Sequence, residues 1–275
     1  MIELTDTKSI YTIADWVEFN VIYDNRTFSK SRIFSQLRAI DDTVEEATID
    51  SVMSELIRRS ELYGNASPFI VEKKSIKPKV RWSHRPELTM CLIFSIRGVV
   101  KQKGEDDGTK LFEILSSEAV KSYLKGEAEV IGFEKQKRLR KQIKCISEKA
   151  CERPGSREPR AKDKDKGVDI IAWKSHGDKR SNQIVLLLQC GAGIHFTAKK
   201  PISLTAWTEF VQWSARPVIG IMIPIIPSEE QWIKIRDDYN LIFDRVRIYR
   251  ALYNSSFSNR QLRKRILAWC RTALN

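Results

Sequence analysis

Two short apolar runs, residues 168–173 (VDIIAW) and 183–190 (QIVLLLQC), constrain the fold of this chain more than any other feature. Both are rich in branched side chains, and a link of nine residues, eight polar and one glycine (KSHGDKRSN), joins them. This pattern favours two antiparallel strands in a hairpin. A third apolar run at residues 217–226 predicts another strand, and helices are expected at 204–213 and 229–239. Strands covered by helices predict an α/β fold.

Each strand of the predicted hairpin carries one polar side chain in an otherwise apolar run. Asp169 stands near the start of the first strand, and Gln189 lies 20 residues later, near the end of the second. A hairpin brings these two positions together, so we expect the side chains to lie side by side. A buried carboxylate needs a metal, a cation or a hydrogen-bond donor to compensate it. Each residue alone also fits a strand-end role, with Asp169 paired to Lys166 or Lys174.

The residues of the hairpin resemble a known family. The order Gly167-Val-Asp169-Ile-Ile, then Leu188-Gln189-Cys190, resembles the core of the PD-(D/E)XK nuclease superfamily, in its Mrr-like restriction endonuclease branch. In that branch Gln replaces the acidic residue of the third motif and Cys follows it. The family also has a helical Glu before the hairpin, and Leu111-Phe112-Glu113 matches that phrase.

One position departs from the family pattern. The family has a lysine two residues after this Gln, but this chain has Gly191 at that position. The nearest lysines are Lys199 and Lys200. The resemblance implies a restriction-endonuclease-like core, with a central mixed sheet flanked by helices. Activity then depends on one of these two lysines reaching the site.

The resemblance further implies a metal-dependent endodeoxyribonuclease that uses Mg²⁺, with Mn²⁺ as a substitute. Mg²⁺ prefers oxygen ligands, so Asp169, Gln189, Glu113 and the carbonyl of Cys190 are expected to hold it, and Lys199 to act in catalysis. The expected setting is restriction or anti-phage defence, with DNA, a homodimer and partner subunits of a defence operon as partners. The alternative is a catalytically decayed, nuclease-like DNA-binding protein, and an RNA-directed nuclease is a third interpretation.

The first part of the chain has a different pattern. Residues 8–64 predict three helices and residues 68–82 two short strands, an order typical of a winged-helix domain. We therefore predict a helical, winged-helix-like DNA-positioning domain at residues 1–103 and a nuclease domain at residues 104–275. On the first of these, DNA contacts are expected from Arg58 and Arg59 on the third helix and from Lys73 and Lys74 on the wing.

Positive charge is the main compositional signal. The net charge is +13 with a pI near 9.5, which favours polyanionic partners such as nucleic acid. Residues 132–166 hold 13 Lys or Arg against 6 Asp or Glu. We expect Arg138, Lys141 and Lys200 to contact DNA; the alternative for this stretch is a solvated helix face followed by a loop.

Several other chemistries find little support. Five scattered cysteines and three dispersed histidines show no zinc-like spacing, and Cys190 has no histidine at a recognised spacing to make it a nucleophile. Glu134 is a second candidate for the helical Glu, and His195 a loop residue near the site. The first residues lack a signal-peptide pattern and no apolar run approaches a membrane span, so a cytoplasmic protein without membrane contact is expected.

Overall fold

The structure is a computed structural model. It describes residues 2, 4 and 6–275 apart from 100–106, 132–135, 160–165, 194–195 and 255–258, and only the backbone of 136–138 and 254. The chain divides into two compact units: the first comprises residues 1–108, 224–228 and 257–275, and the second residues 109–223 and 229–256. The sequence placed the first boundary after residue 103 and gave residues 257–275 to the second domain, whereas in the structure the C-terminal helix belongs to the first unit.

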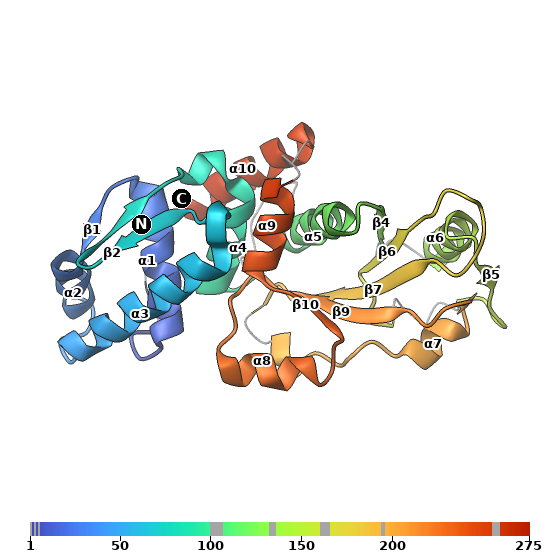
Figure 1. The fold of residues 1–275 in the computed structure, drawn as a ribbon, viewed down its shortest axis with the longest axis horizontal. Helices are drawn as coiled ribbons and strands as arrows, with labels where there is room; N and C mark the ends of the chain where they lie inside the picture. The colour runs from blue at the N-terminus through green and yellow to red at the C-terminus, as the bar shows by residue number, and fades with distance from the viewer. Residues whose placement is uncertain are drawn as a thin grey trace. The chain divides into compact units, whose positions relative to one another are not determined.

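The first unit contains the helices and the hairpin that the sequence predicts (Figure 1). Its elements are α1 (Ile10–Asp24), β1 (Phe28–Ser29), α2 (Lys30–Arg38), α3 (Glu46–Tyr63), β2 (Phe69–Glu72), β3 (Ser75–Pro78), α4 (Pro86–Arg97) and α10 (Arg260–Leu274). The three strands form an antiparallel sheet in the order β1-β3-β2. The two-residue strand β1 was not predicted, because it is too short to show an alternating pattern.

Local sequence explains where these helices begin and end. The hydroxyls of Ser9 and Ser29 accept hydrogen bonds from the first turns of α1 and α2, as capping serines do. α4 begins at a proline, is followed by Gly98 as its C-terminal cap, and is buried along nearly its whole length. α10 packs against α4, with the rings of Phe94 and Trp269 stacked 5.1 Å apart. This apolar contact is why the C-terminal helix joins the first unit.

The second unit is a mixed sheet covered by helices, which confirms the predicted α/β class. Its elements are α5 (Gly108–Leu124), β4 (Glu127–Val130), α6 (Gln136–Lys149), β5 (Arg153–Pro154), β6 (Ile170–Lys174), β7 (Ile184–Cys190), α7 (Leu204–Thr208), β8 (Val211–Gln212), β9 (Val218–Met222), α8 (Glu229–Arg236), β10 (Leu241–Phe243) and α9 (Arg245–Asn254). The main sheet has the order β10-β9-β7-β6-β4. β6 pairs antiparallel with β4 and β7, while β7, β9 and β10 run parallel.

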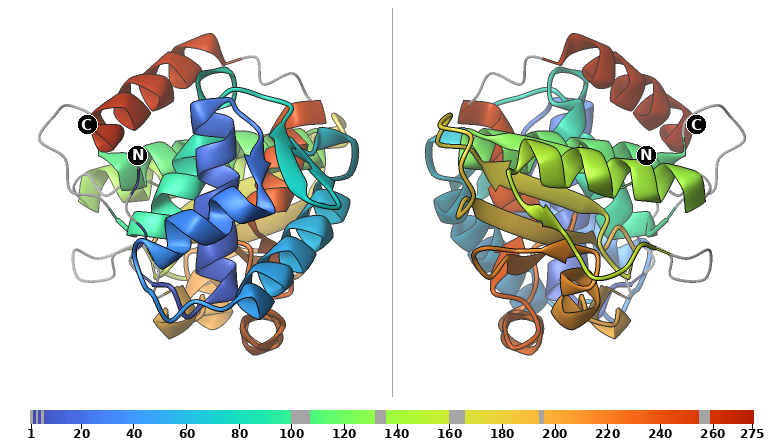
Figure 2. Two further views of the ribbon diagram at one scale, coloured as in Figure 1. Left: turned by 90° about the vertical axis from the view of Figure 1, so that its left-hand side faces the viewer. Right: turned by 90° about the vertical axis from the view of Figure 1, so that its right-hand side faces the viewer.

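Both faces of this sheet are covered. Figure 1 shows α5 and α9 on one side of it and α7 and α8 on the other, and the right view of Figure 2 agrees. Alternate residues of β6 and β7, among them Trp173 and Leu187, pack with Ile143 of α6 and Trp207 of α7 in one buried cluster. The hairpin strands are therefore buried on both faces, which explains their nearly continuous apolar sequence.

The described residues include no helix that is long and apolar enough to cross a membrane.

Candidate active site

The predicted hairpin exists, and it brings Asp169 and Gln189 to the same end of the sheet. β6 and β7 pair antiparallel with Ile170 opposite Leu188, so the next positions outward are Asp169 and Gln189. The backbone N–H of Asp169 donates to the carbonyl of Leu188 over 2.9 Å, one residue out of the register of the ladder. Both side chains are only 7% exposed. The structure therefore brings the two residues to the same end of the hairpin.

The Asp169 carboxylate is held by the backbone of the neighbouring strand. Its Oδ2 accepts a hydrogen bond from the N–H of Cys190 over 2.6 Å. Hydrogen bonds to the ionised form compensate a buried carboxylate and favour its charge. This contact fixes the orientation of the Asp169 carboxylate beside the last residues of β7.

Gln189 is held by a residue that the sequence did not reveal. The hydroxyl of Tyr239 donates to Gln189 Oε1 over 2.5 Å. Burial, followed by the charges of Asp238 and Asp169, raises the pKa of Tyr239 to about 12, so its hydroxyl stays a donor near neutral pH. Gly167, at φ +83°, lies so close to the amide that a Cβ would be 3.1 Å from Gln189 Nε2. The backbone turn that precedes Asp169 thus makes room for Gln189.

Cys190 contributes its carbonyl oxygen and not its thiol to the site. Lys199 Nζ donates to that carbonyl over 2.6 Å. Burial raises the pKa of the Cys190 thiol well above its usual range, and the carboxylates of Asp169 and Glu113 raise it further. A thiol that resists ionisation is a poor nucleophile, which agrees with the sequence analysis.

Glu113 approaches the same end of the sheet from α5. It is half-buried, and its charge acts on the Cys190 thiol together with that of Asp169. Ser116, one turn further along α5, lowers the pKa of that thiol in part. The predicted helical residue, Glu113, therefore lies close enough to the hairpin end for its charge to act on Cys190.

The packing around Gly191, where the family pattern has a lysine, explains the position of Lys199. A Cβ on Gly191 would lie 2.9 Å from Phe196 Cβ and 3.2 Å from a methyl group of Ile223. Side chains from elsewhere therefore fill the place of a residue-191 side chain. The short 3₁₀ helix Phe196–Ala198 carries Phe196 into this space and is followed directly by Lys199. The same turn that excludes a side chain at position 191 delivers a lysine to the Cys190 carbonyl.

The donor set suits a hard cation. It comprises two carboxylates, one amide oxygen and one backbone carbonyl, all oxygen atoms of the kind that Mg²⁺ prefers. A cationic group, the Lys199 ammonium, already binds the carbonyl of Cys190. Among the described residues, no three His, Cys, Asp or Glu side chains gather closely enough to hold a metal ion by themselves. A cation at this site would therefore depend on Gln189 and the Cys190 carbonyl as well as on Asp169 and Glu113.

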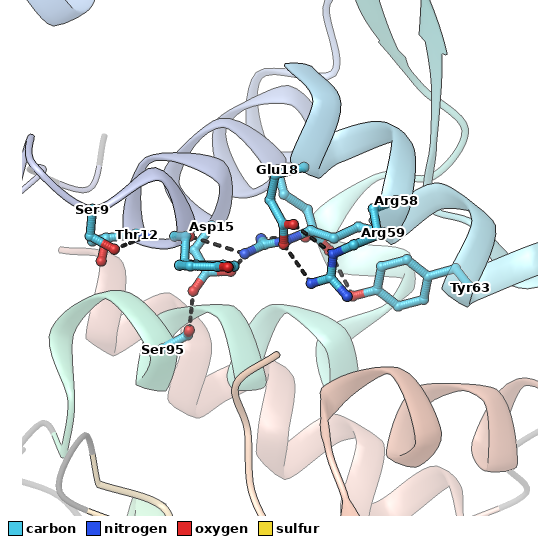
Figure 3. A network of polar contacts seen from close by, with 10 residues as sticks. Ser9, Thr12, Asp15, Glu18, Arg58, Arg59, Tyr63 and Ser95 are labelled. Atoms are coloured by element: carbon cyan, nitrogen blue, oxygen red, sulfur yellow. Dashed lines mark hydrogen bonds and ion pairs between the residues drawn. The ribbon is translucent and has the colours of Figure 1, made fainter. Parts of the chain in front are cut away.

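The prediction that Arg59 contacts DNA is wrong. Its side chain is fully buried in the first unit, where the guanidinium donates to Asp15 over 2.5 Å and to Glu55 over 2.7 Å and lies 3.4 Å from Glu18 (Figure 3). The Tyr63 hydroxyl donates to Glu18 over 2.8 Å. Arg59 is therefore the central cation of a buried polar network, and its guanidinium cannot reach a phosphate.

The arginines of this network favour the ionised form of the Glu55 carboxylate. Burial works to raise the pKa of Glu55, but the hydrogen bond from Arg58 and the charge of Arg59 outweigh it and hold the pKa below its usual value. Arg58 donates to Glu55 over 2.7 Å while its side chain stays 45% exposed. Sequence reasoning missed this network because the carboxylates of α1 and the arginines of α3 are more than 40 residues apart.

The remaining predicted DNA contacts differ in their surroundings. Lys73 and Lys74 are exposed in the first unit, and Lys141 and Lys200 are exposed in the second. The side chain of Arg138, and residues Glu134 and His195, lie outside the described part of the chain.

No protein-family model matches the chain, and no curated protein shows significant similarity to it. The solved structures that align with it include restriction endonucleases. The MspJI restriction endonuclease in complex with a 27-mer oligonucleotide aligns over 69% of this chain and 35% of its own, with 16% identity and a TM-score of 0.32. Restriction endonuclease FokI aligns over 96% and 48%, with 7% identity and a TM-score of 0.22. The chain spans between about a third and a half of these two proteins, and at such scores neither alignment carries an argument about its function.

Proposed function

We propose that this chain is a metal-dependent endodeoxyribonuclease of the PD-(D/E)XK type, in the Mrr-like branch. The observation that carries the proposal is the convergence at the end of one hairpin of the Asp169 carboxylate, the Gln189 amide and the Lys199 ammonium. This combination of oxygen donors and a cation matches the residue types that phosphodiester hydrolysis needs. The family pattern of acidic residue, Gln and lysine supports it, with Lys199 in place of the lysine missing at Gly191.

Each residue has a distinct role in this proposal. Asp169, Gln189, Glu113 and the Cys190 carbonyl hold Mg²⁺, or Mn²⁺ in its place. When bound, such an ion activates water and neutralises charge on the scissile phosphate. The Asp169 carboxylate is oriented by the Cys190 N–H, and the Gln189 amide is oriented by Tyr239. Lys199 supplies a positive charge beside these groups, where it stabilises developing negative charge.

The first unit serves, in this proposal, as a winged-helix-like module that positions DNA. Support comes from its element order and from the exposed lysines Lys73 and Lys74 on the β2–β3 turn. Double-strand cleavage needs two active sites, so the proposal includes a homodimer. Cytoplasmic action in restriction or anti-phage defence, with partner subunits of a defence operon, extends the same proposal.

A second candidate function is DNA binding without cleavage. The observation that favours it is the engagement of the site by its own residues: the Gln189 oxygen accepts from Tyr239, and the Cys190 carbonyl accepts from Lys199. A decayed nuclease site is expected to satisfy its polar groups internally in this way.

Cleavage of supercoiled plasmid in the presence of Mg²⁺ or Mn²⁺, with DNA affinity measured in parallel, tests the proposal. We expect the wild-type chain to nick plasmid and Asp169→Asn to lose at least about 100-fold in rate while its affinity for DNA is kept. The matched control is Asp178→Asn, which changes an exposed carboxylate in the hairpin loop and should leave the rate unchanged.

The outcomes separate the two candidates. Cleavage that survives in Asp169→Asn removes this site from the mechanism. Tight DNA binding by the wild type, with no cleavage under either metal, overturns the nuclease proposal in favour of the binding protein.

A further inference from the structure

The second unit contains a cavity of about 450 Å³ that lies apart from the hairpin-end residues. One wall is α6, and the other is formed by β5, the residues that follow it, and Phe210, which directly precedes β8. None of Asp169, Gln189, Lys199 or Glu113 lines it. Its volume falls within the range of about 300–1,000 Å³ that is usual for small-molecule sites.

Glu152 supplies this cavity with an unmatched acceptor. The residue is 7% exposed, and its Oε2 accepts from the N–H and the hydroxyl of Ser214 over 2.8 and 2.7 Å. Its other oxygen, Oε1, is buried and has no protein donor within the part of the chain that the structure describes. A buried carboxylate oxygen without a donor is unfavourable. The cavity wall thus contains a carboxylate with one unmatched acceptor, which the N–H group of a ligand would complete.

Arg157 and Phe210 supply a planar surface. The guanidinium of Arg157 lies 5.0 Å from the centre of the Phe210 ring, and its Nε donates to Glu209 over 2.5 Å. Gly155 permits this arrangement, since a Cβ there would lie 2.1 Å from the Glu209 carbonyl oxygen. An arginine positioned beside an aromatic ring can stack against a planar ligand such as a nucleobase.

The α6 wall supplies positive charge. Lys141 and Lys144 are exposed and line the cavity, and in the described part of the chain no ion pair is found for either. Such lysines can meet the phosphate of a ligand whose planar part lies deeper in the cavity. An acceptor, a stacking surface and two cations therefore line one cavity of suitable size.

We propose that this cavity binds a single nucleotide, with the base stacked on Arg157, a base N–H donated to Glu152 and the phosphate near Lys141 and Lys144. The ligand is defined by its chemistry, an aromatic base that carries an N–H donor and a phosphate. It can come from a free nucleotide or from an unpaired nucleotide of a strand. This proposal goes beyond the proposed cleavage function, because it uses none of the hairpin-end residues.

Calorimetric titration of the full chain tests it, with the four nucleoside 5′-monophosphates and with short single-stranded oligonucleotides as probes. Ribose 5-phosphate, which lacks the base, serves as the negative ligand. We expect at least one nucleotide probe to bind and ribose 5-phosphate to bind at least tenfold more weakly. Monophosphate binding identifies a free nucleotide as the source, and binding of oligonucleotides alone identifies a strand.

Two variants connect the binding to the cavity. Glu152→Gln keeps an oxygen for Ser214 but removes the second acceptor, and we expect at least tenfold weaker binding. Lys144→Glu changes an exposed helical residue that does not threaten the fold, and it should weaken binding similarly. Its matched control is Lys234→Glu, at an exposed position of α8, which should bind as the wild type does.

The proposal is overturned if no nucleotide probe binds below millimolar concentration. It is equally overturned if binding survives in both Glu152→Gln and Lys144→Glu, because the site then lies elsewhere. Neither result depends on plasmid cleavage, so the cavity and the proposed nuclease site succeed or fail separately.

Discussion

Replacing Lys199 by Met tests the least conventional part of the proposed active site. The change keeps an apolar side chain of similar length and removes the ammonium that binds the Cys190 carbonyl. Lys200 is the matched control, since it is the next residue, carries the same charge and is also exposed. Any effect of general positive charge on DNA binding should appear in Lys200→Met as well.

The expected magnitude follows from the contact. A hydrogen bond of 2.6 Å from an ammonium to a carbonyl is charge-assisted. Removing one preorganised donor from a transition-state site costs about 100-fold to 1,000-fold in kcat, or roughly 3–4 kcal/mol. Because Lys199 is exposed, solvent screens its charge and we expect the lower end, about 100-fold. The stability of the fold should change by less than about 1 kcal/mol.

Single-turnover plasmid cleavage at saturating enzyme, with DNA affinity from fluorescence anisotropy, measures this effect. Lys199→Met should be about 100-fold slower with affinity within a few-fold of wild type, whereas Lys200→Met should lose affinity more than rate. Equal cleavage rates for the two variants would refute the assignment of Lys199. An equal loss of DNA affinity in both, with no difference in cleavage rate, would mean that the charge acts on binding alone.

Three further predictions follow from buried groups. Arg59→Leu leaves three carboxylates without their central cation and should lower the free energy of unfolding by about 3–5 kcal/mol, as measured by urea denaturation. Tyr239→Phe removes the donor to Gln189 and should slow single-turnover cleavage about fivefold with unchanged DNA affinity. Burial raises the pKa of Glu87, so the folded chain keeps this proton to a higher pH than the unfolded chain, and wild-type stability falls as pH rises through the raised pKa. Glu87→Gln lacks that loss, so its thermal stability relative to wild type should increase as pH rises above the usual pKa of a glutamate and through the raised one.

Each of these has an outcome that contradicts it. A loss below about 1 kcal/mol in Arg59→Leu would show that the buried network is not paired as described. Cleavage by Tyr239→Phe at the wild-type rate would mean that Gln189 needs no positioning. A stability difference for Glu87→Gln that is constant with pH would place the Glu87 carboxyl in a solvated environment.

Most of the secondary structure was predictable because it depends on local patterns. Apolar periodicity located α1, α2 and α3, and the polar link KSHGDKRSN located the turn between β6 and β7. The elements that were missed, β1, β4 and the β5–β8 pair, are short and carry no apolar run of their own. They exist because a neighbouring strand offers its backbone hydrogen bonds.

The proximity of Asp169 and Gln189 was also determined by the sequence, because a hairpin of known turn fixes which residues face each other. Local sequence alone could not show the partners that come from distant segments. Tyr239 reaches Gln189 from 50 residues away, and the carboxylates of α1 enclose Arg59 on α3. Charge on a helix predicts a surface residue by default, and only the packing of another helix against it decides otherwise.

The sequence by itself therefore determined the α/β class, the hairpin and the pair of polar residues at its end, since these follow from side-chain periodicity and chain connectivity. The tertiary structure alone decided which lysine serves the hairpin end. Phe196 fills the space beside Gly191, and Lys199 binds the Cys190 carbonyl instead. It also decided that Arg59 is buried and that Glu152 lies in the wall of a cavity with one oxygen that no described protein group meets. Such outcomes depend on which distant side chains compete for the same volume, and spacing along the chain does not encode that competition.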